Sequence, residues 1–136
     1  MASSKTKVFI SHSAADAATA KAVAQALHTA GVSTFLDIEQ ISPGDNWRED
    51  ILAQLETASI YLLLVSPEYV KSSWSQFEIG VAVARARERG AQVVPVLLGD
   101  ARVPSALLGF QRLEGLRLTP SEIAEWVKRL VEVERK

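Results

Sequence analysis

The chain of 136 residues contains no cysteine, so a disulfide bond, a thiolate nucleophile and a cysteine-ligated metal site are excluded. No apolar run approaches the roughly 20 residues that a membrane span needs, and no signal-peptide core follows the short basic N-terminus. The chain has 15 Lys and Arg against 16 Asp and Glu, so its formal net charge is -1. It therefore has no excess of positive charge to bind nucleic acid or an anionic membrane. These absences predict a cytoplasmic protein with neither a nucleic-acid nor a membrane partner.

Familiar phosphate-binding and phosphotransfer motifs are absent as well. No GxGxxG or GxxxxGK[ST] pattern occurs, which excludes the dinucleotide fingerprint and the P-loop. A phosphoacceptor receiver needs an acidic cluster after its first strand and an aspartate after its third, where this chain has Ser11-His12 and Ser66. The two histidines, His12 and His28, are isolated, so the sequence predicts neither a metal site nor a bound cofactor.

What is present is the composition of an ordinary globular domain, with 48% hydrophobic and 23% charged residues. The length suits one core and is too short for two ordinary domains, so we expect a single domain over residues 1–136 with an ordered core over about 7–133. The last residues still follow a helical pattern. This leaves open whether the chain ends there naturally or is excised from a longer protein.

Apolar runs alternate with helical segments along the chain, which predicts an α/β fold with a parallel sheet covered on both faces. Right-handed crossovers favour the doubly wound strand order 2-1-3-4-5. Pro95 indicates an interrupted ladder or a bulge in the fourth strand, and Trp126 is assigned to the core-facing stripe of the last helix. The predicted strands cover residues 7–11, 33–37, 59–65, 91–98 and a weak fifth within 112–118. Helices follow Ser13, Asn46 and Thr119, and a further helix carries Trp74 and Glu78 and runs to about Gly90.

One segment, Ser72–Glu78, follows the most apolar strand and opens a helix. Trp74 and Glu78 are four residues apart, so they share one face of that helix. Ser75 and Glu78 also have the spacing of a capping box, as do Ser73 and Gln76, and in such a box the carboxylate only satisfies amide donors at the helix start. Taken alone, the segment favours this capping role.

The predicted strand order reverses that preference. In a 2-1-3-4-5 sheet the switch point lies between strands one and three, and ligands bind outside their carboxyl ends. The loop Ser11-His12-Ser13 and the segment leading to Glu78 flank this crevice, and the loop over residues 37–47 can reach over it. We therefore expect Glu78 to share a pocket with Trp74 and the loop after the first strand, where His12 is either a loop hydrogen-bonder or a ligand contact.

In this order and spacing, the motifs resemble the TIR (Toll/interleukin-1 receptor) domain family. The likeness covers nearly the whole chain, and it is to the bacterial or plant type rather than to animal receptor adaptors. Each motif alone is weak, whereas their order and spacing are specific. The matching motifs are Val8–Asp16, Phe35-Leu36-Asp37 with Gly44, Ile51–Leu55, Leu64–Tyr69 and Ser72–Glu78.

The resemblance implies a flavodoxin-like, five-stranded sheet of order 2-1-3-4-5. In the NAD-cleaving branch it implies an NAD+ glycohydrolase or ADP-ribosyl cyclase that breaks the nicotinamide–ribose bond to give nicotinamide and ADP-ribose or a cyclic ADP-ribose. NAD+ is then the substrate, and no cofactor is implied. Glu78 matches the catalytic glutamate of this branch. Substrate contacts are implied for Ser11, His12, Ser13, Asp37, Trp47 and Trp74.

The resemblance also implies self-assembly with other TIR domains. The loop after the second strand matches one that docks on a neighbouring subunit and gates the pocket, with Ile41, Pro43, Gly44 and Asp45 as its assembly residues. Activation by assembly and a role in bacterial immune signalling, such as antiphage defence, follow as expectations. The family often has tyrosine where this chain has His12. The chain therefore lacks the aromatic stacking partner that the family often has at this position.

A single carboxylate is sufficient for this chemistry. Glycosidases generally use two, because an alkoxide-like leaving group must be protonated, whereas nicotinamide leaves as a neutral molecule. Two alternatives stay open: a non-enzymatic TIR scaffold for homotypic interaction, and a nucleoside N-glycosidase or deoxyribosyltransferase that also uses one glutamate. Nicotinamide release from NAD+, compared with turnover of deoxynucleosides, separates the three.

Overall fold

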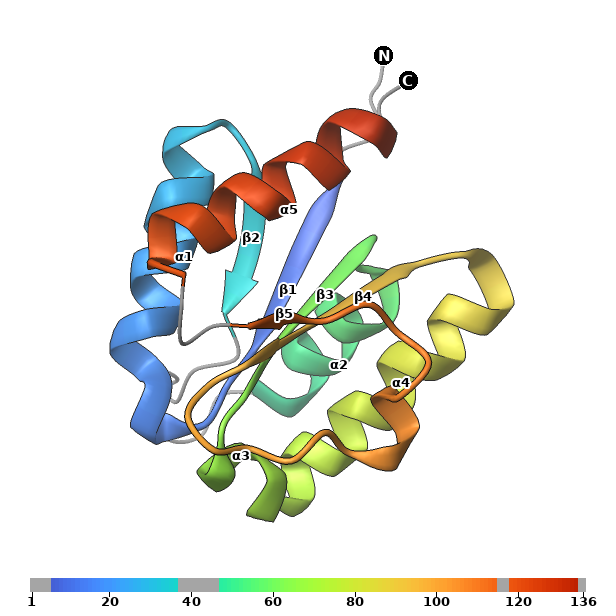
Figure 1. Cartoon of the computed structure of the whole chain (residues 1–136). Helices are drawn as coiled ribbons and strands as arrows, with labels where there is room; N and C mark the ends of the chain where they lie inside the picture. Colours follow the sequence, from blue (N-terminus) through green and yellow to red (C-terminus); the bar gives the residue numbers. More distant parts are fainter. Residues whose placement is uncertain (1–5, 37–46, 115–117, 135–136) are drawn as a thin grey trace.

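A computed structural model describes residues 6–36, 47–114 and 118–134. Within these residues the strands form one parallel sheet of order β2-β1-β3-β4-β5 (Figure 1). The predicted α/β fold and the order of the first four strands are confirmed, and within the described residues two residues of the predicted fifth strand pair with the end of β4. The strands are β1 (Lys7–Ser11), β2 (Ser33–Leu36), β3 (Ile60–Val65), β4 (Gln92–Leu97) and β5 (Leu113–Glu114).

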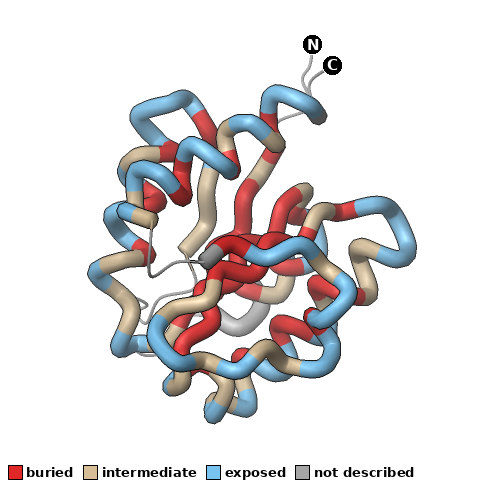
Figure 2. The backbone as a smooth tube through the Cα atoms, in the orientation of Figure 1, coloured by how far each residue is buried: buried red, intermediate tan, exposed pale blue. Residues whose placement is uncertain are grey.

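Helices cover both faces of this sheet (Figure 1). Successive strand residues point to opposite faces, so Ile60, Leu62 and Leu64 pack with α1 and α5, while Tyr61 and Leu63 pack with α2, α3 and α4. The strands β1, β3 and β4 are accordingly mostly buried, the edge strand β2 is only partly buried, and the outer helix faces are exposed (Figure 2). The helices are η1 (Ala14–Asp16), α1 (Ala17–Thr29), α2 (Trp47–Thr57), α3 (Pro67–Lys71), α4 (Ser73–Arg89), η2 (Ser105–Leu107) and α5 (Pro120–Glu134).

The interruption predicted at Pro95 is wrong. The ladder between β3 and β4 runs without a bulge from Gln92 to Leu97. The amides of Gln92 and Leu98 donate to carbonyls of the β3 segment, so the even-numbered amides of β4 face β3. The nitrogen of Pro95 therefore faces the other side, where pairing with β5 begins only at Val96. Proline is tolerated there because no ladder bond is lost.

The last helix begins as predicted but presents one residue differently. Thr119 and Glu122 form a reciprocal capping box, with amide-to-side-chain distances of 3.1 and 2.8 Å. Trp126, predicted in the core, is 40% exposed, and the Arg129 guanidinium lies 5.7 Å from its ring centroid. Trp126 therefore lies beside the buried stripe of α5, which contains Ile123, Val127 and Val131, and not within it. No helix in the described ranges has the length and apolar character to cross a membrane.

Candidate active site

The structure brings Ser11 and Glu78 together at the carboxyl ends of the central strands. Ser11 is the last residue of β1 and lies in register with Leu63 of β3. After β3 the chain passes through α3 into α4, which carries Glu78 over the same edge of the sheet. The Ser11 hydroxyl donates to Glu78 Oε1 at 2.6 Å, and both side chains are completely buried. This edge, between β1 and β3, is the switch point where ligands of such folds bind.

Glu78 does not cap its helix. The N-cap of α4 is Ser72, whose hydroxyl accepts from the amide of Ser75 at 3.2 Å. Glu78 is the sixth residue of α4, counting Ser73 as the first, and lies beyond the amides that lack partners in a first turn. The capping interpretation of the Ser75 and Glu78 spacing is therefore wrong, because the helix begins earlier than that spacing requires.

A third buried side chain joins this pair. The hydroxyl of Tyr69 lies 2.7 Å from Ser11 Oγ, and Tyr69 has no exposed surface. Tyr69 is placed by the start of α3, where the hydroxyl of Ser66 accepts from the Tyr69 amide at 3.1 Å. The sequence analysis missed this residue. The available signal was a serine N-cap followed by Pro67, which places the third helical residue directly after a fully buried strand.

The electrostatics of this cluster are unusual for a protein interior. Burying an ionised carboxylate is costly unless hydrogen-bond donors replace the lost water. Ser11 supplies such a donor to Glu78 from the end of β1. A short hydroxyl-to-carboxylate bond of this kind is about twice as strong as a neutral one. The arrangement can hold a negative charge in a fixed direction, which suits the stabilisation of a cationic transition state.

The loop after β1 places its two polar residues differently from each other. His12 is 9% exposed, and its Nδ1 donates to the carbonyl of Ser13 at 2.8 Å. Its Nε2 is buried and has no hydrogen-bond partner among the residues that the structure describes. The Ser13 hydroxyl donates to Asp16 Oδ2 at 2.8 Å and caps no amide. His12 thus has a buried ring nitrogen that no described residue bonds, whereas the hydroxyl proton of Ser13 is committed to Asp16.

Trp74 lies one helical turn before Glu78 on α4. Its ring is half-buried against the apolar residues between the sheet and α4, and it stacks on Phe77 with centroids 5.1 Å apart. Phe77 is itself 44% exposed. The remaining predicted contacts cannot be placed: Asp37, Ile41, Pro43, Gly44 and Asp45 lie outside the described residues, as does the side chain of Trp47, the first residue of α2.

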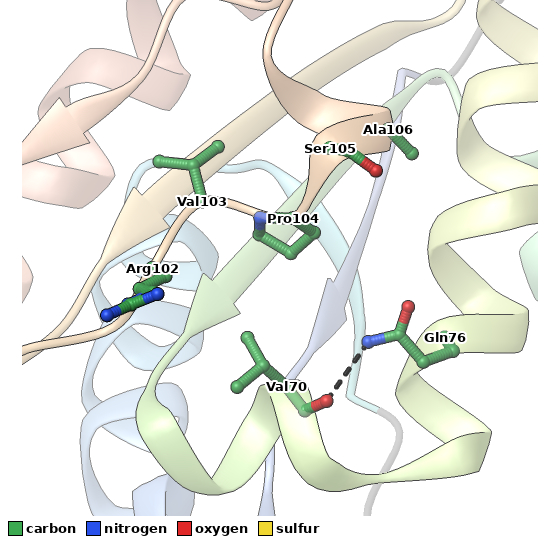
Figure 3. A pocket seen from close by; sticks show the side chains of 7 residues that line it. All are labelled: Val70, Gln76, Arg102, Val103, Pro104, Ser105 and Ala106. Carbon is green, nitrogen blue, oxygen red and sulfur yellow. Dashed lines mark hydrogen bonds between the residues drawn. The ribbon is translucent and has the colours of Figure 1, made fainter.

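A pocket of about 280 Å³ lies between α3, the start of α4 and the segment that leads into η2 (Figure 3). The Gln76 side chain donates to the carbonyl of Val70 at 3.1 Å along its wall. Gln76 and Glu78 are two residues apart on α4 and so point in different directions. The pocket and the buried carboxylate are therefore separate features. The residues that line the pocket are Val70, Gln76, Arg102, Val103, Pro104, Ser105 and Ala106.

Fold and site together define a doubly wound α/β protein with a buried glutamate at its switch point. Within that class, the sequence profile described as TIR domain matches residues 8–131, so the chain belongs to the TIR domain family. The crystal structure of the TIR domain of the Toll-related receptor TRR-2 from Hydra magnipapillata superposes with a TM-score of 0.71. That match covers 95% of this chain and 98% of the other at 20% identity, which shows the shared fold.

Two bacterial proteins are similar in sequence. The 2' cyclic ADP-D-ribose synthase BtTIR of Bacteroides thetaiotaomicron is 29% identical over 89 residues, which are 65% of this chain and 31% of that protein. The 2' cyclic ADP-D-ribose synthase AbTIR of Acinetobacter baumannii is 26% identical over 90 residues, which are 65% of this chain and 34% of that protein. The matches therefore span about a third of the length of these relatives.

Proposed function

We propose that this protein is an NAD+ nucleosidase that releases nicotinamide and forms ADP-ribose or a cyclic ADP-ribose. The observation that carries the proposal is the buried Glu78 carboxylate, held by the Ser11 hydroxyl at 2.6 Å on the switch-point edge of the sheet. The names of two bacterial relatives, both 2' cyclic ADP-D-ribose synthases, support the same class of reaction.

The proposed step breaks the bond between C1′ of the ribose and the pyridinium nitrogen of NAD+. The electron pair of that bond leaves with nicotinamide, which becomes neutral, so no general acid is needed. The ribose carbon acquires oxocarbenium character, and Glu78 stabilises that positive charge. Water captures C1′ and releases a proton to solvent to give ADP-ribose. Alternatively, a hydroxyl of the same molecule captures C1′ and releases its proton to solvent to give a cyclic product. Positioning of the ribose supplies the rest of the rate enhancement.

Other residues of the cluster have proposed roles around this step. Trp74 borders the nicotinamide ring and contributes a cation–π contact of about 1 kcal/mol. The Nε2 of His12 accepts a hydrogen bond from the substrate, in keeping with its buried acceptor. Ser13, Asp37 and Trp47 are proposed to complete the wall of the substrate site.

Access to the carboxylate connects catalysis with assembly in this proposal. Glu78 has no exposed surface, so substrate contact requires its neighbours to move. We assign that change to self-assembly through the loop that contains Ile41, Pro43, Gly44 and Asp45, which docks on a second TIR domain. A head-to-tail contact of this kind propagates into open assemblies, and selective stabilisation of the open site would couple assembly to turnover. Such a trigger suits bacterial immune signalling, including antiphage defence.

The test measures nicotinamide release from NAD+ by the purified protein across a dilution series, with products identified by NMR. We expect specific activity to rise with protein concentration, in parallel with light scattering. Glu78→Gln should remove the activity, and Glu88→Gln, on the exposed face of the same helix, is the matched control. Assembly without nicotinamide release would instead support a scaffold, and turnover of deoxynucleosides alone would support a nucleoside N-glycosidase. Specific activity that stays flat with concentration would refute the coupling.

A further inference from the structure

Ser11 Oγ makes hydrogen bonds on two sides. One joins it to Glu78 Oε1 at 2.6 Å, and the other joins it to the hydroxyl of Tyr69 at 2.7 Å. All three side chains are completely buried. The two contacts join residues 67 and 58 positions apart in the chain, so they exist only when β1, α3 and α4 are correctly assembled.

The direction of these hydrogen bonds follows from the number of protons. A serine hydroxyl carries one hydrogen, and Ser11 donates it to the carboxylate, which can only accept. In the contact with Tyr69 the serine oxygen must therefore accept, and the phenol donates. The bonds run from Tyr69 through Ser11 to Glu78, and each donor polarises the next.

We propose that Tyr69 is a positioning residue, which fixes the Ser11 hydroxyl so that its proton stays directed at Glu78. The catalytic consequence rests on the proposed NAD+ cleavage, whereas the hydrogen-bond relay itself does not. Without the phenol, the Ser11 hydroxyl can rotate, and the carboxylate loses the fixed direction of this donor. Tyr69 contacts no reacting atom in this scheme and acts only through Ser11.

The backbone supports this role. Tyr69 belongs to a five-residue helix that begins with the Ser66 cap and Pro67, so its backbone is fixed at the point where it leaves β3. Ser11 is fixed by its pairing with β3. The two hydroxyls therefore belong to rigid elements, which is what a relay that pre-orients a reacting group needs.

The kinetic test uses Tyr69→Phe, which keeps the buried ring and removes only the hydroxyl. We expect kcat for nicotinamide release to fall by roughly tenfold, by analogy with the loss of a hydrogen-bond partner that orients a metal ligand, which costs about 10–100-fold. KM for NAD+ should stay unchanged, since Tyr69 does not touch the substrate. The control is Tyr61→Phe, which alters the other tyrosine of the chain, also buried and hydrogen-bonded, and should leave kcat per folded molecule unchanged.

A double-mutant cycle separates positioning from general support of the fold. Ser11→Ala should lower kcat at least as much as Tyr69→Phe, and adding Tyr69→Phe to Ser11→Ala should lower it no further, because the relay is already broken. If the double variant instead lowers kcat by the product of the two single effects, the proposal is overturned.

An infrared measurement tests the relay without any activity. The carboxylate band that disappears in Glu78→Gln belongs to Glu78, and it should shift in both Tyr69→Phe and Ser11→Ala but not in Tyr61→Phe. An unchanged band in Tyr69→Phe overturns the relay. A wild-type protein that releases no nicotinamide refutes the proposed function, and the band then still decides the relay. If Tyr69→Phe does not fold, 3-fluorotyrosine in the Tyr61→Phe background labels Tyr69 alone, and a 19F shift insensitive to Ser11→Ala overturns the proposal.

Discussion

The two ends of α4 each pack against a buried tyrosine, but they use it for different purposes. At the C-terminal end, the Arg89 guanidinium donates to the carbonyls of Glu56 and Ala58 at 2.7 and 2.8 Å and to the Tyr61 hydroxyl at 3.2 Å. The Tyr61 hydroxyl in turn donates to the carbonyl of Leu55. These bonds satisfy carbonyls that α2 leaves without partners at its end, so this end of α4 secures one helix to another.

At the N-terminal end, the hydrogen bonds of the tyrosine and serine hydroxyls lead to a carboxylate, Glu78. A protein that needed only stability would do as well with an apolar side chain in place of a buried acid. The comparison teaches that the bonding partner of a buried polar group indicates its purpose. Some such groups complete secondary structure by bonding to backbone carbonyls, and others hold a charge in place. Substitutions at the first end should affect stability, and substitutions at the second should affect activity.

The largest expected effect comes from Glu78→Gln. Nicotinamide release should fall about a thousandfold, because the group that stabilises the developing charge becomes neutral. The thermal midpoint should change little, since the amide oxygen still accepts from Ser11. Both are measured on the same preparation. A variant that keeps full activity, or one that unfolds, would remove the contrast between the two ends of α4.

Trp74→Ala should have the next largest effect. We expect turnover to fall roughly tenfold through loss of the aromatic wall and its cation–π contact. The half-buried ring should cost less stability than the 3–5 kcal/mol typical of a core aromatic truncation. Denaturant unfolding and nicotinamide release per folded molecule decide this. Large destabilisation with unchanged turnover would place Trp74 with the structural residues.

Arg89→Ala should show the opposite pattern. Losing the bonds to the end of α2 should lower the free energy of unfolding by about 1–2 kcal/mol. Turnover per folded molecule should stay the same, since Arg89 lies at the far end of α4 from Glu78. The control is Arg87→Ala, an exposed arginine on the same helix. A loss of turnover beyond the loss of folded protein would show that the two ends are coupled.

The smallest expected effect is a pH dependence of stability. Burial raises the pKa of Tyr61 above its ordinary 10.0, and the nearby Arg89 opposes this only in part. The folded state therefore holds the phenol proton more tightly than the unfolded state does. The resulting stability is fully present below pH 10 and is lost as the pH rises through the folded pKa. Urea unfolding from pH 9 upward should show a steeper loss in the wild type than in Tyr61→Phe, and equal slopes would contradict this assignment.

The strand order and the meeting of Ser11 with Glu78 could be predicted from the sequence, because apolar alternation and crossover handedness leave few topologies. The capping box at Thr119 was equally readable. The cap of α4 was not, because consecutive serines from Ser72 offer several equivalent registers, and the choice depends on where α3 ends. Tyr69 was missed because its contact with Ser11 spans 58 residues and is set by packing. The prediction that Trp126 lies in the core was wrong because helical periodicity does not locate the edge of a buried stripe.

Ser72 ends α3 and begins α4: its amide bonds to the carbonyl of Tyr69, and its own carbonyl accepts from Gln76. No linker residue separates the two helices, so a rotation of α4 must displace α3 as well. Tyr69 and Glu78 stand on opposite sides of this joint, whereas Ser11 belongs to the sheet. Any displacement of the joined helices therefore changes both hydrogen bonds of Ser11 at once. One residue inserted at position 72 would allow α3 and α4 to move separately, which the present chain does not.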